Sequence, residues 1–125
     1  MARLLRPGGT FHVLDDHPAA FLFDPDVAEL RPSGADYFHH AFTTNGWSAE
    51  YIGDLGKPVD AHPAKYERFW TLSDIFTALT AAGLVVTQFG EHADEYWRSF
   101  PLLDEQTRSR LPMTFSKTAR RPEPQ

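Results

Sequence analysis

The strongest pattern of apolar and polar positions in this sequence is a helical one. In "TLSDIFTALTAAG" the apolar side chains recur every three or four residues and share one face: Leu72, Ile75, Phe76 and Leu79. Thr71 is a favourable N-cap with Asp74 three residues later, and Gly83 is typical of a helix C-terminus. The pattern predicts one main amphipathic helix, which begins after Thr71 and ends before Gly83.

Three further stretches have the composition of β-strands. "TFHVL" (10–14) follows "LLRPGG", in which a proline ends a helix and two glycines turn the chain. "LVVTQFGEH" (84–92) follows the main helix with almost no loop, as in α/β units. "MTFSKTAR" (113–120) alternates so that Met113 and Phe115 share one face of a last strand. The order of these elements predicts an α/β domain.

Between the first strand and the main helix, residues 18–70 show no long periodic helix but many aromatic side chains. Aromatic residues bury large areas when they fold, which argues against disorder. We expect an ordered cap insertion with short strands, "WSAEYIGD" (47–54) among them. The single partial domain then divides into residues 1–17, the cap at 18–70, the helix and strands of 71–119, and a polar tail at 120–125.

Composition and charge restrict the class of function. The formal net charge is −5 and the basic residues are scattered, so the sequence lacks the basic patch of a nucleic-acid-binding protein. It contains no cysteine, which excludes disulfides and thiol nucleophiles and is compatible with a reducing compartment. No apolar run is long enough to cross a bilayer or to form a signal peptide. By elimination we expect a cytoplasmic protein that binds neither nucleic acid nor membrane.

Three stretches in this order resemble the carboxyl-terminal half of class I S-adenosylmethionine-dependent methyltransferases: "RLLRPGGTFHVLDDHP", "YERFWTLSDIFTALTAAGLVV" and "LPMTFSKTARRP". The resemblance covers nearly all of the chain. It implies an α/β fold class with a partial Rossmann-like sheet of three strands, one main amphipathic helix and an aromatic-rich cap over the substrate. The last strand would be antiparallel and inserted between the other two. The implied activity is methyl transfer from S-adenosylmethionine to a small-molecule acceptor.

The cofactor-binding part of that family has no counterpart in this sequence. Family members hold the cofactor with a glycine-rich loop that joins a strand to a helix, and with an acidic residue that ends the second strand. The pair Gly8-Gly9 precedes a strand, so it is not that loop. We therefore expect a truncated domain, the carboxyl-terminal portion of such an enzyme, which binds no S-adenosylmethionine and is inactive when alone.

A strand that is central in the family would be left with an open edge here. Such an edge presents a row of unpaired N–H and C=O groups and recruits another strand. Three interpretations stay open: a complementary chain that carries the other half, a homodimer through the edge of Thr10 to Leu14, or a truncated reading frame. A different class of protein is also open, a non-catalytic binding or assembly module derived from the same fold.

Four residues are candidates for acceptor binding: Asp15, His17, Tyr37 and Trp47. Asp15 and His17 follow the first strand at its carboxyl end, where α/β sheets bind ligands, and either side chain could orient an acceptor or remove its proton. The simpler interpretation is a polar strand end before a proline turn. Catalysis of this kind depends mostly on positioning, so the sequence identifies no catalytic residue.

The aromatic side chains of the cap have two interpretations. They could wall an apolar acceptor or attract a sulfonium by cation–π contact, or they could simply form the core of the cap. The side chains in question are Tyr37, Phe38, Trp47, Tyr51 and Trp70.

The histidines suggest a metal enzyme that would use His17, His39 and His62, because imidazole suits zinc, iron and manganese. Adjacent histidines such as His39 and His40 point to opposite faces of an extended chain, and no His-x-x-x-His spacing occurs. We predict no metal site.

Overall fold

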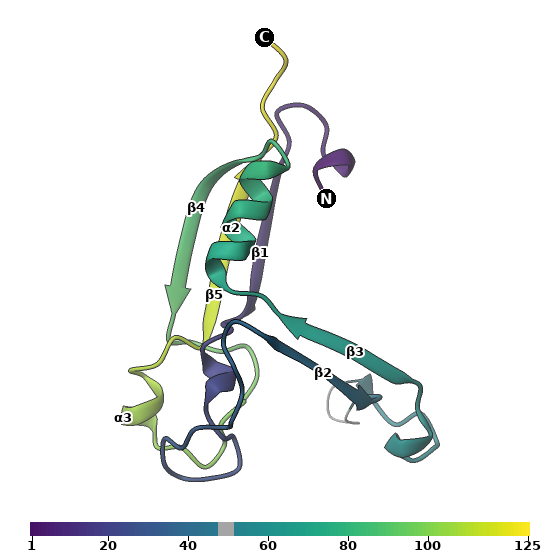
Figure 1. Ribbon diagram of the computed structural model, residues 1–125, viewed down its shortest axis with the longest axis vertical. Coiled ribbons are helices and arrows are strands. Elements are labelled where there is room, and N and C mark those ends of the chain that lie inside the picture. The colour runs from purple at the N-terminus through teal and green to yellow at the C-terminus, as the bar shows by residue number, and fades with distance from the viewer. Residues whose placement is uncertain (48–51) are drawn as a thin grey trace.

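The computed structural model describes residues 1–47 and 52–125. The strands are β1 (Thr10–Asp16), β2 (His40–Asn45), β3 (Ala64–Phe69), β4 (Val85–His92) and β5 (Thr114–Arg120), and the α-helices are α2 (Leu72–Ala81) and α3 (Glu105–Arg108). Single-turn 3-10 helices span Ala2–Leu4, Ala20–Leu22 and Val59–Ala61. Figure 1 shows two separate sheets, with α2 along one face of the larger sheet and the β2–β3 hairpin extending away from its lower end.

The larger sheet contains the three strands that the sequence predicts. Its order is β1-β5-β4, and β5 pairs antiparallel with both neighbours. The register runs from Thr10 opposite Arg120 to Asp16 opposite Thr114, so β1 extends two residues beyond the predicted "TFHVL". The predicted position of the last strand, antiparallel and between the other two, is confirmed.

The predicted fold class, an α/β partial Rossmann-like sheet, is wrong. A Rossmann-like sheet is built mostly from parallel strand pairs, whereas every ladder in residues 1–47 and 52–125 is antiparallel. The five strands of this part of the chain form two sheets and carry only two α-helices. The physical reason is that β5 separates β1 from β4, so the two strands that run in the same direction never pair with each other.

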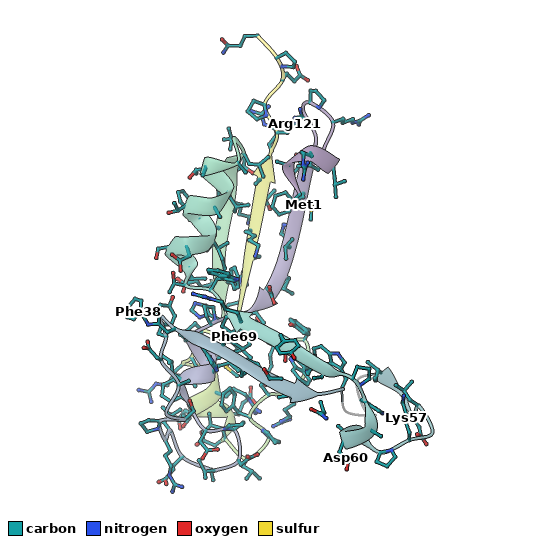
Figure 2. The ribbon with its side chains drawn as sticks, turned by 45° about the vertical axis from the view of Figure 1, so that its right-hand side comes forward. Met1, Phe38, Lys57, Asp60, Phe69 and Arg121 are labelled. Carbon is teal, nitrogen blue, oxygen red and sulfur yellow. The ribbon has the colours of Figure 1, made fainter. Side chains whose placement is uncertain are left out.

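The smaller sheet is a hairpin of β2 and β3, with a register from His40 opposite Phe69 to Asn45 opposite Ala64. It belongs to the segment that the sequence predicts as a cap. Figure 2 shows the hairpin running from Phe38 and Phe69 beside the larger sheet to Lys57 and Asp60 at its far end. The strand predicted at 47–54 falls mostly on residues 48–51, which lie outside the described residues.

Helix α2 confirms the helical pattern. The Thr71 hydroxyl oxygen accepts a hydrogen bond from the backbone N–H of Asp74 at 3.0 Å, and Gly83 follows the helix with φ of +77°. The Phe76 ring contacts Phe89 of β4 edge-to-face, with centroids 6.2 Å apart. No side chain of α2 is fully buried, so the helix covers the sheet loosely. No helix of the described residues is long and apolar enough to cross a membrane.

The buried core lies at the end of the sheet, beside α3. It consists of Ala20, Phe100, Leu103 and Met113, with Phe23 and Leu111 packed against it. The backbone N–H of His17 donates to the carbonyl of Met113 at 3.0 Å, which ties the end of β1 to this core. The core therefore fixes the position of the two aspartates that end β1.

Candidate functional site

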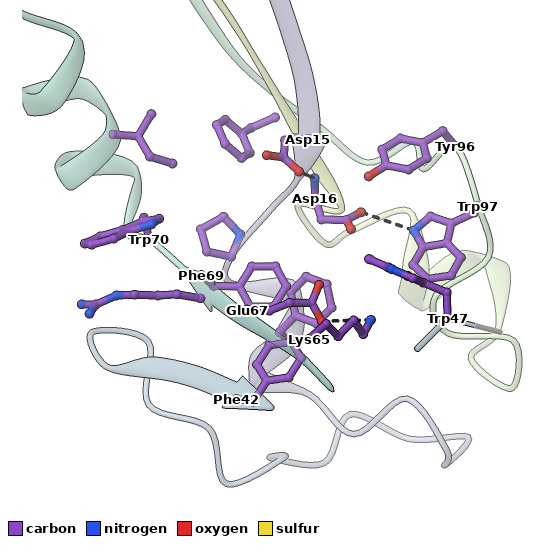
Figure 3. A pocket seen from close by; sticks show the side chains of 15 residues that line it. Asp15, Asp16, Phe42, Trp47, Lys65, Glu67, Phe69, Trp70, Tyr96 and Trp97 are labelled. Carbon is purple, nitrogen blue, oxygen red and sulfur yellow. Dashed lines mark hydrogen bonds and ion pairs between the residues drawn. The ribbon is translucent and has the colours of Figure 1, made fainter. Parts of the chain in front are cut away.

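A cavity of about 520 Å³ opens where the end of β1 meets the β2–β3 hairpin (Figure 3). All three tryptophans of the chain line it, so we name it the tryptophan cavity: Trp47, Trp70 and Trp97. The other aromatic side chains that line it are Phe21, Phe42, Phe69, Tyr96 and Phe115. Charged side chains also reach it from β1 and β3: Asp15, Asp16, Lys65, Glu67 and Arg68.

Two of the three carboxylates that line the cavity come from adjacent residues of β1, Asp15 and Asp16. Adjacent side chains on a strand point to opposite faces, but both reach the cavity because it lies at the strand end. The Oδ1 atom of Asp15 accepts a hydrogen bond from the backbone N–H of Asp16 at 2.8 Å, and Trp97 donates its Nε1–H to Oδ1 of Asp16 at 3.5 Å. Figure 3 shows the Asp16 carboxylate directed toward Trp97 and Tyr96.

The environment of Asp16 disfavours its charged form. Burial raises the pKa of Asp16 above its ordinary value of 3.8, hydrogen bonds from Tyr96 and Trp97 oppose this shift, and the charges of Asp15 and Glu95 add to it. Asp16 is therefore a carboxyl group with a raised pKa in a cavity, which is a common property of side chains in functional sites.

The walls of the cavity are aromatic rings in contact with one another. Phe69 of β3 stacks on Phe21 with ring centroids 3.9 Å apart, and Phe42 of β2 lies 5.7 Å from Phe69. At the hairpin side the Nζ atom of Lys65 lies 3.2 Å above the Trp47 ring and 3.1 Å from Oε2 of Glu67. These contacts build an aromatic wall at the hairpin side, where Lys65 is paired with Glu67.

Two of the four predicted site residues, Asp15 and Trp47, line the tryptophan cavity. His17 is 3% exposed; its Nδ1 accepts a hydrogen bond from the N–H of Ala19 at 3.1 Å, and its Nε2 lies 2.6 Å from Oε2 of Glu91. The Nδ1 contact puts the ring proton on Nε2, which donates to Glu91.

Tyr37, the fourth predicted residue, contacts the start of α2. Its hydroxyl oxygen accepts a hydrogen bond from the N–H of Leu72 at 3.3 Å. Both His17 and Tyr37 therefore have partners within the fold, and their part in acceptor binding stays a prediction.

Sequence reasoning did not select several residues that form the cavity: Asp16, Lys65, Phe69, Tyr96 and Trp97. Two signals could have found some of them. Asp16 is adjacent to the selected Asp15, and the pair Tyr96-Trp97 interrupts an otherwise polar segment. Lys65 carries no such signal, because nothing in the sequence shows that its charge lies over Trp47.

A second hollow of about 1,100 Å³ lies beside α2, and we name it the α2 groove. Phe38 and Trp70, two of the aromatic side chains singled out from the sequence, line it together with Lys117 of β5. Burial lowers the pKa of Lys117 below its ordinary value of 10.5, and the charge of Asp15 opposes this shift. Tyr51, from the same aromatic set, lies outside the described residues.

Residues 1–47 and 52–125 contain no group of three or more His, Asp or Glu side chains placed to hold a metal ion. His39 pairs with Asp36 at 3.2 Å, and Nε2 of His62 donates to the carbonyl of Lys57 at 3.3 Å. His17, His39 and His62 thus have separate surroundings and do not form the cluster that a metal enzyme would need.

The described residues do not fit S-adenosylmethionine in the way that the resembling family holds it. That arrangement needs a glycine-rich turn between a strand and a helix. Strand β3 leads into α2 through Trp70 and Thr71, without a glycine. Gly8 and Gly83, two of the positive-φ glycines, lie before strands instead.

A comparison with family models and with curated proteins finds no match for this chain.

Proposed function

We propose that this chain is the carboxyl-terminal, acceptor-binding portion of an S-adenosylmethionine-dependent methyltransferase that acts on a small molecule, and that it is inactive alone. One observation carries the proposal. The tryptophan cavity has the volume of a small-molecule site, about 520 Å³, and this chain alone builds its aromatic walls and its carboxylates. The three sequence stretches that resemble the family support the reaction type, whereas the antiparallel sheets give it no support.

In this proposal the chain binds and orients the acceptor. The aromatic walls exclude water from the acceptor, and Asp15 and Asp16 accept hydrogen bonds from its polar group. The absence of cysteine from the sequence is compatible with the cytoplasmic location that we also propose.

The remaining part of the enzyme would join at the outer edge of β1. In residues 1–47 and 52–125 this strand pairs on one side only, with β5. A strand from a complementary chain or from a second copy would satisfy the backbone groups of the other side.

The proposal is tested by comparing the recombinant chain with the chain isolated from its source cells together with its bound partners. We expect the recombinant chain to bind no S-adenosylhomocysteine in a calorimetric titration, and the isolated complex to transfer a labelled methyl group to small acceptors. Binding by the recombinant chain would contradict the proposed division of the enzyme. An isolated complex that labels no small molecule would contradict the proposed activity.

A second candidate, a non-catalytic binding or assembly module, is favoured by the same cavity. Its walls and its carboxylates come from one chain, so a ligand needs no second subunit to complete the site. If the isolated complex binds small molecules but transfers no methyl group to them, the result would support the binding module over the enzyme.

A further inference from the structure

We propose that the tryptophan cavity binds a small organic ammonium ion, an amine with an aromatic or apolar body, and that its positive charge lies against Asp15 and Asp16. The inference rests on the proposed function in one respect, since it takes this cavity as the acceptor site. It goes further in naming the chemical class of the acceptor, an amine that binds in its protonated form. Its nitrogen could accept a methyl group only after it gives up a proton, and Asp15 and Asp16 are the carboxylates placed to take that proton.

The charges around the cavity favour a cation. Lys65 and Glu67 pair with each other at 3.1 Å and neutralise one another. The ion pairs within the described residues include neither Asp15 nor Asp16. The other cation that lines the cavity, Arg68, lies over the Trp70 ring, and the lining side chains keep an excess of one negative charge. An ammonium ion would satisfy both aspartates, because charge-assisted hydrogen bonds to carboxylates are the strong ones.

The aromatic walls favour the same class of ligand. A cation near the face of a tryptophan or tyrosine ring is attracted by the ring quadrupole. The chain already uses this attraction twice in the cavity, with Lys65 above Trp47 at 3.2 Å and the guanidinium carbon of Arg68 4.0 Å from the Trp70 ring. Trp97 and Tyr96 lie beside Asp16, so an ammonium group at that carboxylate would also lie close to aromatic rings.

The stacked phenylalanines define the body of the ligand. Phe21, Phe42 and Phe69 form one continuous apolar surface, with ring centroids 3.9 and 5.7 Å apart along the stack. A flat apolar group stacks on such a surface better than a polar chain does. The site therefore combines a charged end at β1 with an apolar surface at the hairpin.

The test uses three probes of nearly equal shape and different charge: 2-phenylethylamine, 2-phenylethanol and phenylacetate. All three tryptophans of the chain line the cavity, so their fluorescence reports binding there, and none of the probes contains an indole. We expect the amine to bind at least about tenfold more tightly than the alcohol, and the carboxylate to bind weakest. Equal or tighter binding of the alcohol or the carboxylate, or no fluorescence change with any probe, would overturn the proposal.

Variants separate the carboxylates from general effects of charge. The double variant D15N/D16N should reduce the preference for the amine over the alcohol to less than about threefold, with an unchanged far-ultraviolet circular dichroism spectrum. The matched control D26N removes a carboxylate from an exposed loop and should keep the full preference. A double variant that is folded and keeps the preference would contradict the assigned role of the aspartates.

The outcomes for this inference and for the proposed function are distinguishable, because the fluorescence titration contains no cofactor. If the chain binds amines selectively and its isolated complex transfers no methyl group, the proposed ligand class is supported and the proposed enzyme activity is contradicted. If the complex transfers methyl groups to an uncharged acceptor and the chain shows no preference for amines, the proposed activity is supported and the proposed ligand class is contradicted.

Discussion

The carboxyl group of Asp16 is less stable in its charged form than it would be in water, because it is partly buried among aromatic rings. Its folded-state pKa is therefore raised above the ordinary value of 3.8. The stability that the protonated form contributes is fully present below the pKa of the unfolded chain and is lost as the pH rises through the raised pKa. In its ionised form the side chain weakens the fold, and a ligand cation would relieve this cost.

We predict that D16N changes the free energy of unfolding by no more than about 0.5 kcal/mol at pH 7, in the stabilising direction. The asparagine keeps an oxygen that can accept the Trp97 hydrogen bond but carries no charge. Relative to the variant, the wild-type chain should gain stability as the pH falls from 7 to below 4, which urea unfolding at several pH values measures. Asp36 and Asp104 have lowered pKa values, but they occur in both chains and cancel in the difference. A pH-independent difference would contradict the raised pKa.

His17 illustrates a residue whose role in stability can be separated from its predicted role in acceptor binding. The H17A variant removes a side chain that is 3% exposed and contacts Glu91 and Ala19, so the free energy of unfolding should fall by about 2 kcal/mol. The matched control H12A replaces an exposed histidine of β1 and should cost less than about 1 kcal/mol. If H17A is folded and loses amine binding specifically, His17 belongs to the site as the sequence predicts.

At the scale of elements, the periodic patterns predicted the main helix and all three strands of the larger sheet. They missed the β2–β3 hairpin, because the exposed and partly buried positions of β3 contradict hydrophobic alternation. In β3 the side chain of Tyr66 is 82% exposed, whereas Lys65 and Glu67 face the cavity. An ion pair and a cation–π contact stabilise this reversed arrangement, and neither can be read from a sequence pattern.

The candidate site was predictable to the same limited extent. Asp15 was accessible to sequence reasoning because a carboxylate at a strand end is conspicuous, and Trp47 because the cap is rich in aromatics. Tyr96 and Trp97 reach the cavity from a segment about 50 residues away from Trp47, and only the fold brings them to the end of β1. The fold class was wrong because it came from the resemblance to a mostly parallel sheet, whereas β5 pairs antiparallel with both of its neighbours and β2 and β3 form a second antiparallel sheet.

Helix α2 depends on its N-cap more than a buried helix would, because none of its side chains is fully buried. We predict that T71A lowers the free energy of unfolding by about 1 kcal/mol, since the N–H of Asp74 loses the Thr71 oxygen. The T71S variant keeps that oxygen and should lose less than half as much. Urea unfolding followed by circular dichroism measures both, and equal losses would show that the Thr71 methyl group, not the cap, matters.

At the scale of the whole molecule, the chain exposes more surface than a compact protein of its mass. A compact protein of 14.2 kDa exposes about 6,800 Å², whereas this chain exposes 8,554 Å². The excess is about twice the area that one partner buries in a standard protein–protein interface. Large apolar side chains on β1 and near α2 contribute to it, with Leu14 49% and Trp70 50% exposed. We therefore predict that part of this surface is covered by another chain.

The backbone of β1 indicates where such association would begin. The N–H of His17 donates to Met113 and that of Arg121 to Gly9, and hydrogen-bonded positions alternate along an antiparallel pair. The odd-numbered residues of β1 therefore bond to β5, and the N–H and C=O groups of Thr10, His12 and Leu14 point to the outer edge. The remaining outward N–H, that of Asp16, is bonded by the Asp15 side chain. At the other edge of the sheet, an irregularity between Val86 and Gln88 interrupts β4, which discourages pairing.

We predict that the purified chain associates with itself through β1 and that L14P prevents this. Proline removes the outward N–H of Leu14 but leaves the inward hydrogen bonds to β5, and it is tolerated on edge strands. Light scattering after size exclusion should give a mass above 14.2 kDa for the wild-type chain and 14.2 kDa for a folded L14P variant.

The control L14A removes most of the apolar side chain and keeps the N–H, so it should still associate. If L14A is monomeric as well, the apolar side chain rather than the strand edge drives association. A monomeric wild-type chain would mean that the open edge of β1 does not pair with itself and is left for a different chain.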